Sequence, residues 1–218
     1  MIKAVLFDFD GTLVDTNSLI IRSLEEAFAY MLPDRKFTKA EILDCIGPTL
    51  EQTGKKYFAD EFATFVEYYR ELNHKYHDEM IEVYPGIKQM LEALKHKGLN
   101  LAIVTSKRRD FAIKGLKKAG LFQFFDYIVA SDDVVNPKPH SEPIDLVIDH
   151  YGLTPSECLM VGDNSHDIDA AKAAGVKSIA VGWAFKGIDY LKRLNPDYLI
   201  YDAMEIVEIV DANLYTTI

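Results

Sequence analysis

The sequence has little cysteine and no long hydrophobic run. Its 218 residues include two cysteines, Cys45 and Cys158, which lie far apart and form no C-x-x-C pair. This excludes a disulfide framework and a cysteine-rich zinc site, and we expect both thiols to be small buried apolar groups. The first apolar run, Ala4–Phe7, is too short for a signal peptide, and no run approaches the ~20 apolar residues of a membrane span. The chain is therefore expected to work in the cytoplasm, without a membrane partner.

Positive charge is also scarce. Lysine and arginine number 24 against 34 aspartates and glutamates, so the formal net charge is −10. Such a balance argues against binding to nucleic acids or to anionic membranes. It would also repel a phosphate-bearing substrate, so any anion site in this chain needs local positive charge.

The sequence lacks repeats and Gly/Ser-rich linkers, yet its periodicity changes along the chain. Residues 16–82 carry apolar side chains at helical spacing and no convincing strand. Elsewhere, short apolar strands alternate with helices, which is typical of parallel βαβ units. We therefore expect an α/β protein whose Rossmann-like, doubly wound parallel sheet is built from residues 1–15 and 83–218. An all-helical cap, residues 16–82, would be inserted after the first strand, with hinges near residues 13–16 and 82–85.

The individual elements follow from this periodicity and from capping signals such as Thr38 with Glu41. Strands are expected at residues 4–9, 99–105, 127–130, 159–161, 178–181 and 198–200. Helices are expected at residues 19–31, 38–45, 50–58 and 60–78 in the cap, and at 87–97, 110–119, 143–151, 167–174 and 204–210 in the sheet region.

Two aspartates stand at the end of the first expected strand. Asp8 and Asp10 are two residues apart and are followed by Gly11, which ends the strand. Strand side chains alternate between faces, so these two carboxylates point the same way. They repel each other unless a cation or a proton lies between them. The pair suits a carboxylate nucleophile beside a carboxylic acid, with a divalent metal shared between them.

Polar side chains follow three other strands as well. Thr105, Ser106 and Lys107 come after the strand at 99–105, and Lys138 lies in a proline-flanked loop after the strand at 127–130. Asp163 and Asp167 follow the strand at 159–161. In open parallel sheets, ligands bind outside the carboxyl ends of the strands, so these groups should converge on one rim. Hard oxygen ligands without a His/Cys cluster favour Mg²⁺ over Zn²⁺.

The four segments that carry these residues resemble the four motifs of the haloacid dehalogenase-like (HAD) hydrolase superfamily. They read VLFDFDGTLVDT, IVTSK, NPKPHSEP and VGDNSHD, in the family's order, and the resemblance covers essentially the whole chain. It implies a Mg²⁺-dependent phosphohydrolase that acts through an aspartyl-phosphate on a small-molecule phosphate substrate. Asp8 would be the nucleophile, and Asp10 the general acid/base.

The same resemblance assigns the remaining motif residues. The Thr105 hydroxyl and the Ser106 N–H would hold phosphoryl oxygens, and Lys138 would neutralise the nucleophile and the transferring group. The metal would be held by Asp8, by the backbone carbonyl of Asp10, by Asp163 and by Asp167. For Asp167, which is expected to open a helix, plain N-capping is the alternative. The neighbouring His166 is expected to be a surface residue at the start of that helix.

The cap should decide the substrate. Arg70 and His74 lie four residues apart, so they could share a helix face that reaches a substrate anion. The alternative is an ordinary solvated face. A loop at residues 46–50 joins two cap helices and could either approach the site or form a plain turn.

Several activities remain open within the family. The cap segments resemble HAD-type inorganic pyrophosphatases, and the motif spacing resembles phosphoglycolate phosphatases. A β-phosphoglucomutase-type phosphotransferase is disfavoured because Ile20 stands where that enzyme has a cap histidine, and Asp10 argues against a dehalogenase. A catalytically silent HAD-like binding protein is the non-enzymatic alternative. The oligomeric state is expected to be a monomer or a homodimer.

Overall fold

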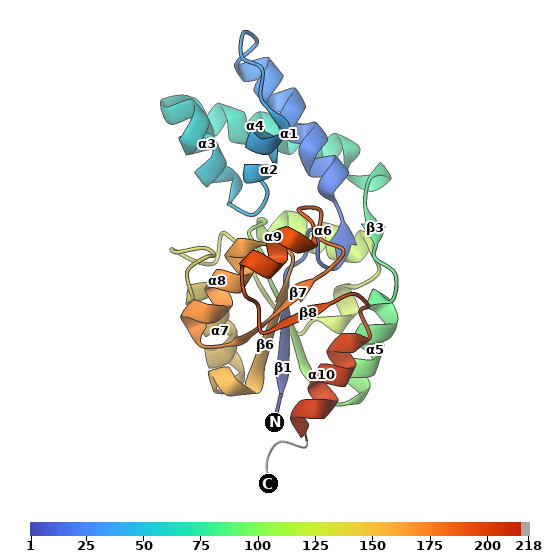
Figure 1. Cartoon of the computed structure of the whole chain (residues 1–218). Helices are drawn as coiled ribbons and strands as arrows, with labels where there is room; N and C mark the ends of the chain where they lie inside the picture. Colours follow the sequence, from blue (N-terminus) through green and yellow to red (C-terminus); the bar gives the residue numbers. More distant parts are fainter. Residues whose placement is uncertain (215–218) are drawn as a thin grey trace.

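A six-stranded parallel sheet forms the core of the computed structural model, which describes residues 1–214 (Figure 1). The spatial order is β5-β4-β1-β6-β7-β8, and all neighbouring strands pair in parallel. The strands are β1 (Ala4–Phe7), β4 (Asn100–Val104), β5 (Tyr127–Val129), β6 (Cys158–Gly162), β7 (Lys177–Val181) and β8 (Tyr198–Ile200). β1 lies in the middle because it is apolar on both faces, as a strand covered by helices on both sides must be.

Helices cover both faces of this sheet. On one face, Val5 and Phe7 of β1 belong to an apolar cluster with α5 (Ile87–His96), α6 (Arg109–Lys118) and α10 (Glu205–Leu214). On the other face, Ala4 and Leu6 pack with α7 (Glu142–Tyr151) and α8 (Ser165–Ala174). This alternation follows from the two-residue period of a strand. The expected α/β fold with a doubly wound parallel sheet is confirmed.

Four further helices lie at the carboxyl end of the sheet, and we call residues 16–82 the cap. They are α1 (Asn17–Met31), α2 (Lys39–Asp44), α3 (Leu50–Phe58) and α4 (Phe62–Tyr76). An aromatic cluster of their own holds them together, in which Phe65 stacks on both Phe28 and Phe58, with ring centroids 5.4 and 4.5 Å away. The long helix expected at residues 60–78 is α4 flanked by the 3-10 turns Ala59–Glu61 and His77–Glu79.

The chain crosses between the sheet and the cap twice, and the two crossings are hydrogen-bonded to each other. β2 (Val14–Asp15) pairs antiparallel with β3 (Glu82–Val83). These strands were not predicted, because two residues are too short for a periodic signal. A short helix after β7, α9 (Ile188–Arg193), was also missed.

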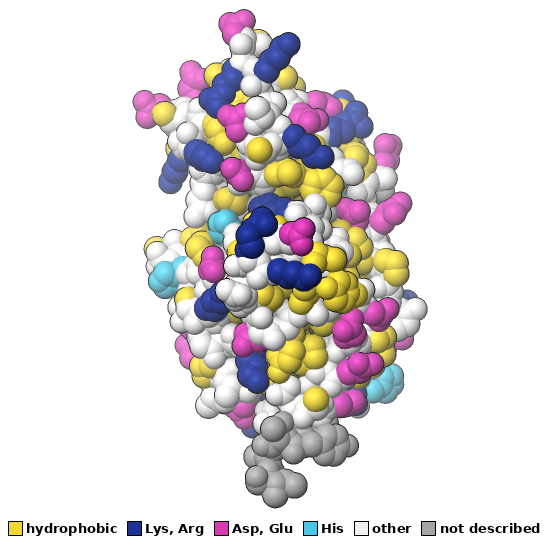
Figure 2. Space-filling model, in the orientation of Figure 1, with side chains coloured by type: hydrophobic (Ala, Val, Ile, Leu, Met, Phe, Trp, Pro, Cys, Tyr) yellow, Lys and Arg dark blue, Asp and Glu magenta, His cyan; other side chains and the backbone are white. Residues whose placement is uncertain are grey.

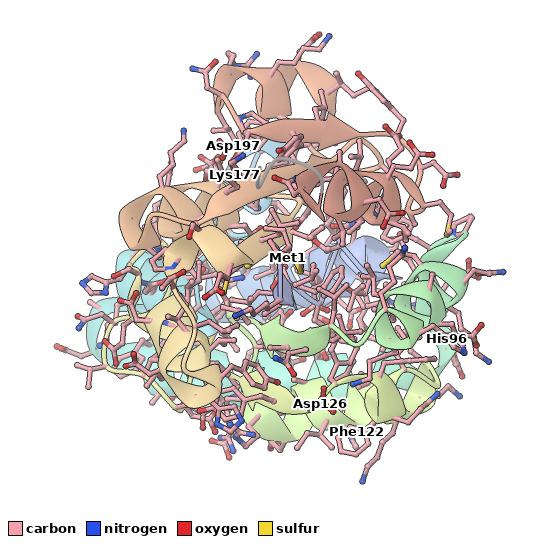
Figure 3. All side chains as sticks on the ribbon, turned by 90° about the horizontal axis from the view of Figure 1, so that it is seen from below. Met1, His96, Phe122, Asp126, Lys177 and Asp197 are labelled. Carbon is pink, nitrogen blue, oxygen red and sulfur yellow. The ribbon has the colours of Figure 1, made fainter. Side chains whose placement is uncertain are left out.

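The amino ends of the strands lie at the end of the sheet opposite the cap, where the labelled side chains form common hydrogen bonds and ion pairs. Seen from below in Figure 3, Met1 lies near the centre, with Phe122 and Asp126 towards one border and Lys177 and Asp197 towards the other. Asp126 accepts a hydrogen bond from Lys95 at 2.7 Å, and Asp197 accepts one from the Ser178 backbone N–H at 2.8 Å. Within residues 1–214, no helix is both long and apolar enough to cross a membrane.

Candidate active site

Three strand ends lie level with one another beneath the cap. The parallel register places Phe7 of β1 between Ile103 of β4 and Val161 of β6. The residues that follow these strands therefore leave the sheet side by side, among them Asp8, Thr105 and Asp163. The structure brings together the strand-end residues that the sequence pattern placed on one rim.

Lys138 occupies the centre of this rim. Its side chain is 3% exposed, and its Nζ donates hydrogen bonds to Asp8 Oδ1 at 2.9 Å, Asp167 Oδ1 at 2.6 Å and the Val104 carbonyl at 2.8 Å. Burial by itself would lower the pKa of Lys138, but attraction to Asp167 and Asp8 outweighs burial and raises the pKa above its ordinary value. The ammonium group therefore stays charged and uses all three of its donors.

Three buried carboxylates form a cluster, and two of them, Asp8 and Asp167, contact this lysine. Asp8, Asp163 and Asp167 each bring one oxygen to within 4.8 Å of the others. Burial raises the pKa of Asp8 to about 7 against the pull of Lys138. Burial, followed by repulsion from Asp167 and Asp8, raises the pKa of Asp163 well above its usual range. Such a cluster is unfavourable as three anions, and its hard oxygen atoms fit a divalent cation.

Two glycines allow the carboxylates to come this close. A Cβ at Gly11 would stand 2.4 Å from Asp163 Oδ2, and one at Gly162 would stand 2.3 Å from the Asp167 Cβ. Gly11 also has φ of +80°, which disfavours other residues.

Asp167 takes part in the capping of a helix and also belongs to the carboxylate cluster. The helix α8 begins at Ser165 rather than at Asp167, and Asn164 is its N-cap. Asp167 is therefore the third residue of the helix, where its Oδ2 accepts the Asn164 N–H at 3.0 Å while its Oδ1 accepts a hydrogen bond from Lys138. The side chain closes a capping box and lines the carboxylate cluster at once.

Asp10 lies apart from the other three carboxylates. Its Oδ1 accepts hydrogen bonds from Lys107 Nζ at 2.8 Å and from the Thr16 hydroxyl at 2.7 Å. Sequence reasoning assigned no role to Lys107, although its place two residues after Thr105 was a usable signal. Thr16 is the first residue of the cap, so Asp10 lies beside the point where the chain crosses into the cap.

The hydroxyl groups of the second motif line the same pocket. Thr105 is buried, and its Oγ1 accepts the Lys107 N–H at 3.2 Å. The Ser106 Oγ is shielded from solvent and finds no hydrogen-bond partner among residues 1–214. A buried hydroxyl without a partner costs free energy unless a water molecule or a ligand satisfies it. Ser106 is therefore placed to contact a bound molecule.

The cap closes this pocket from above. The cavity, about 130 Å³ in volume, is bounded by the strand ends and by Tyr69, Arg70 and Asn73 of α4. Arg70 forms an ion pair with Glu51 at 2.5 Å. The cavity is far smaller than the roughly 300–1,000 Å³ of pockets for drug-sized ligands. It suits a compact substrate.

His74 corrects the expected substrate-binding pair. It does not line the cavity but, together with Arg70, lines a second hollow, and its Nδ1 lies 3.0 Å from Lys114 Nζ of α6. The helical period explains this: positions 69 and 73 of α4 face the cavity, position 70 lies at its edge, and position 74 lies a further ~40° round the helix beyond position 70. Arg70 remains as the cap cation at the cavity.

His166 also differs from its expected place. It lines the cavity instead of lying on the surface, and burial lowers its pKa. The early start of α8 at Ser165 is the cause, because it places His166 in the first turn, whose amino end faces the cap.

Known proteins match this chain over nearly its full length. The family model of the haloacid dehalogenase-like hydrolases matches residues 5–181. A protein named pyrophosphatase PpaX from Halalkalibacterium halodurans is 44% identical over 96% of this chain and 97% of its own length. A protein of the same name from Listeria monocytogenes is 39% identical over 96% of both chains.

Solved structures share the fold as well. The crystal structure of a putative phosphoglycolate phosphatase from Lactobacillus plantarum superimposes with a TM-score of 0.85 at 25% identity. The match covers 95% of this chain and 99% of that one.

Proposed function

The chain belongs to the haloacid dehalogenase-like hydrolases, and we propose that it hydrolyses inorganic pyrophosphate with the help of Mg²⁺. The observation that carries this proposal is a small cavity with the buried Lys138 on its floor and Arg70 in its roof. Two cations on opposite sides suit a substrate with an anionic group at each end. Relatives named pyrophosphatase, at 39–44% identity, support the same choice.

Asp8, Asp163 and Asp167 would hold the metal, because their oxygen atoms already lie within 4.8 Å of one another. The family resemblance adds the backbone carbonyl of Asp10. When bound, Mg²⁺ supplies positive charge that neutralises the carboxylates and the transferring phosphoryl group.

Asp8 is the proposed nucleophile. Lys138 holds its Oδ1, which leaves Oδ2 free to attack the nearer phosphorus atom. A bond forms between Oδ2 and phosphorus, the bridging P–O bond breaks, and its electron pair leaves with inorganic phosphate. The Thr105 hydroxyl and the Ser106 N–H would hold the oxygens of the transferring group, and Lys138 would offset their charge.

Hydrolysis of the aspartyl-phosphate needs a base. In this step Asp10 takes a proton from water, the water oxygen attacks phosphorus, and the Asp8 carboxylate is released with a second phosphate. Lys107 and Thr16 hold the Asp10 carboxylate in place for this role.

The cap is the proposed lid over this chemistry. In this view residues 1–15 and 83–218 are the catalytic core, residues 16–82 exclude water, and the β2–β3 pair is the hinge. Arg70 would bind the distal phosphate, whereas His74 has no part in it. A cytoplasmic location and a monomeric or homodimeric state complete the proposal, and the free, buried Cys45 and Cys158 accord with a reducing compartment.

A substrate panel tests the assignment. Purified protein with Mg²⁺ should turn over pyrophosphate with a kcat/KM at least ~10-fold above that for phosphoglycolate or sugar phosphates, a difference of ~1.4 kcal/mol in transition-state binding. Phosphoglycolate is the second candidate because of the Lactobacillus plantarum structure. A clear preference for phosphoglycolate would replace pyrophosphate as the substrate.

A further inference from the structure

Two segments of the sheet region, one after β6 and one after β7, contact a single backbone carbonyl of the cap. The Ile46 oxygen, in the loop between α2 and α3, accepts hydrogen bonds from Asn164 Nδ2 at 2.9 Å and from Lys186 Nζ at 2.9 Å. Both donors belong to the sheet region, so two core side chains converge on one atom of the cap. On the face shown in Figure 2, basic side chains lie at this junction.

The Asn164 amide is held in the orientation that this contact needs. Its Oδ1 accepts hydrogen bonds from the Tyr190 hydroxyl at 3.3 Å, the Ser165 hydroxyl at 3.2 Å and Lys186 Nζ at 3.4 Å. With donors gathered around the oxygen, the NH₂ group faces Ile46. Asn164 is 3% exposed, so this arrangement is built into the protein rather than formed on its surface.

The cap loop is shaped to sit against this amide. Gly47 has φ of +119°, and a Cβ there would stand 2.8 Å from Asn164 Nδ2. No other residue could keep this backbone conformation and this approach. The contact therefore depends on the loop backbone lying directly on Asn164.

The same turn carries the carboxylate cluster. Asn164 follows Asp163, and its backbone N–H donates to Asp167 Oδ2 at 3.0 Å. The side chain of Asn164 thus touches the cap while its backbone orders a carboxylate of the site. Asn164 alone therefore connects the cap contact to the shape of the turn that carries the carboxylates.

The segment at residues 183–190 contacts the hinge as well. The Trp183 indole N–H donates to the Thr12 carbonyl at 3.1 Å, and its ring lies 5.9 Å from that of Tyr84, which follows β3. Phe185 adds a cap contact, with Lys39 Nζ 6.0 Å from its ring centroid. The segment at residues 183–190 therefore contacts both the hinge, through Trp183, and the cap loop, through Lys186.

We propose that Lys186, Asn164 and Tyr190 form a latch that fastens the loop at residues 46–49 to the core and so sets the population of the closed active site. These are positioning residues that act through the cap. The proposal rests on the proposed function only in taking the cavity as the catalytic site. The apparent substrate dissociation constant is inversely proportional to the closed fraction, so a latch that raises this fraction lowers the apparent constant.

Lys186→Met removes the charged donor and keeps the apolar stem. We expect KM for pyrophosphate to rise roughly 10- to 150-fold, the range for one charged hydrogen bond, with kcat changed much less. Backbone amide exchange of Ile46, Gly47 and Thr49 should become faster. Lys186→Arg should restore both values in large part, because its guanidinium can also donate to the Ile46 oxygen.

The matched control is Lys172→Met. Lys172 also donates its Nζ to a backbone carbonyl, that of Leu194, but within the core. It should leave KM and the exchange of the same three amides as in the wild type. If Lys186→Met behaves like Lys172→Met in both measurements, the latch is wrong. If pyrophosphate is not hydrolysed at all, the substrate assignment fails, and the exchange comparison still decides the latch.

Discussion

At the scale of single residues, the site depends on one buried charge. Lys138 is surrounded by Asp8 and Asp167 and has no solvent to stabilise it. Removing one member of a buried ionic cluster leaves the others uncompensated, which costs more than an exposed ion pair contributes. The roles of these residues can therefore be separated by single substitutions.

Lys138→Met should lower kcat/KM for the preferred substrate by at least roughly 10²-fold, since it removes a cation that faces the developing charge. Steady-state kinetics check this result against Lys172→Met, which removes a surface lysine of the same size. Activity within ten-fold of the wild type would exclude Lys138 from the reaction.

Asp8→Asn should abolish turnover while the fold is kept, because an amide of the same shape cannot form an acyl-phosphate. Circular dichroism and the thermal unfolding midpoint serve as the fold control. Wild-type protein with Mg²⁺ and beryllium fluoride should carry the acyl-phosphate mimic on Asp8, and Asp8→Asn should not. Retained activity in that variant would rule out the covalent mechanism.

At the scale of elements, two capping boxes of the same type lie in the cap at different distances from the cavity. Thr49 caps α3 and accepts the Gln52 N–H at 3.2 Å, directly beside Pro48, which lines the cavity. Thr38 caps α2 in the same way with Glu41. Thr49 and Thr38 therefore make the same capping hydrogen bond, one beside the cavity and one away from it.

Thr49→Ala should destabilise the protein by about 1 kcal/mol, the usual loss for an N-cap. It should also raise KM, because the loop that borders the cavity loses its anchor to α3. Thr38→Ala is the control and should lower the unfolding midpoint without changing KM. Equal KM values for both variants would show that the loop at residues 46–49 does not order the site.

At the scale of the whole molecule, the buried carboxylates connect stability to pH and metal. In the metal-free protein, burial raises the pKa of Asp8 from 3.8 to about 7 and raises that of Asp163 as well. Between the ordinary pKa of 3.8 and the raised pKa of about 7, the native state therefore binds more protons at Asp8 than the unfolded chain does. Stability from these groups is therefore present below about pH 4 and is lost as pH rises towards 7.

Mg²⁺ should reverse this loss, because it binds the ionised carboxylates of the native state. At about 100 times its dissociation constant it should stabilise the protein by ~2.7 kcal/mol, which is roughly 5–10 °C in unfolding midpoint for a chain of this size. Thermal unfolding with Mg²⁺ and with a chelator should differ more at pH 7.5 than at pH 5. Asp163→Asn should remove most of the difference, and a shift that does not depend on pH would contradict the assigned site.

Local pattern was sufficient to predict the fold class and to predict which strand-end residues come together. The two-residue period of strands and the shared carboxyl edge of parallel strands bring Asp8, Thr105 and Asp163 together whatever the loops do. The pairing of Lys107 with Asp10, the contact of His74 with Lys114 and the contact of Lys186 with the cap were decided by tertiary structure alone. Each depends on how elements distant in sequence cross and rotate against one another, and periodicity within one element carries no information about that.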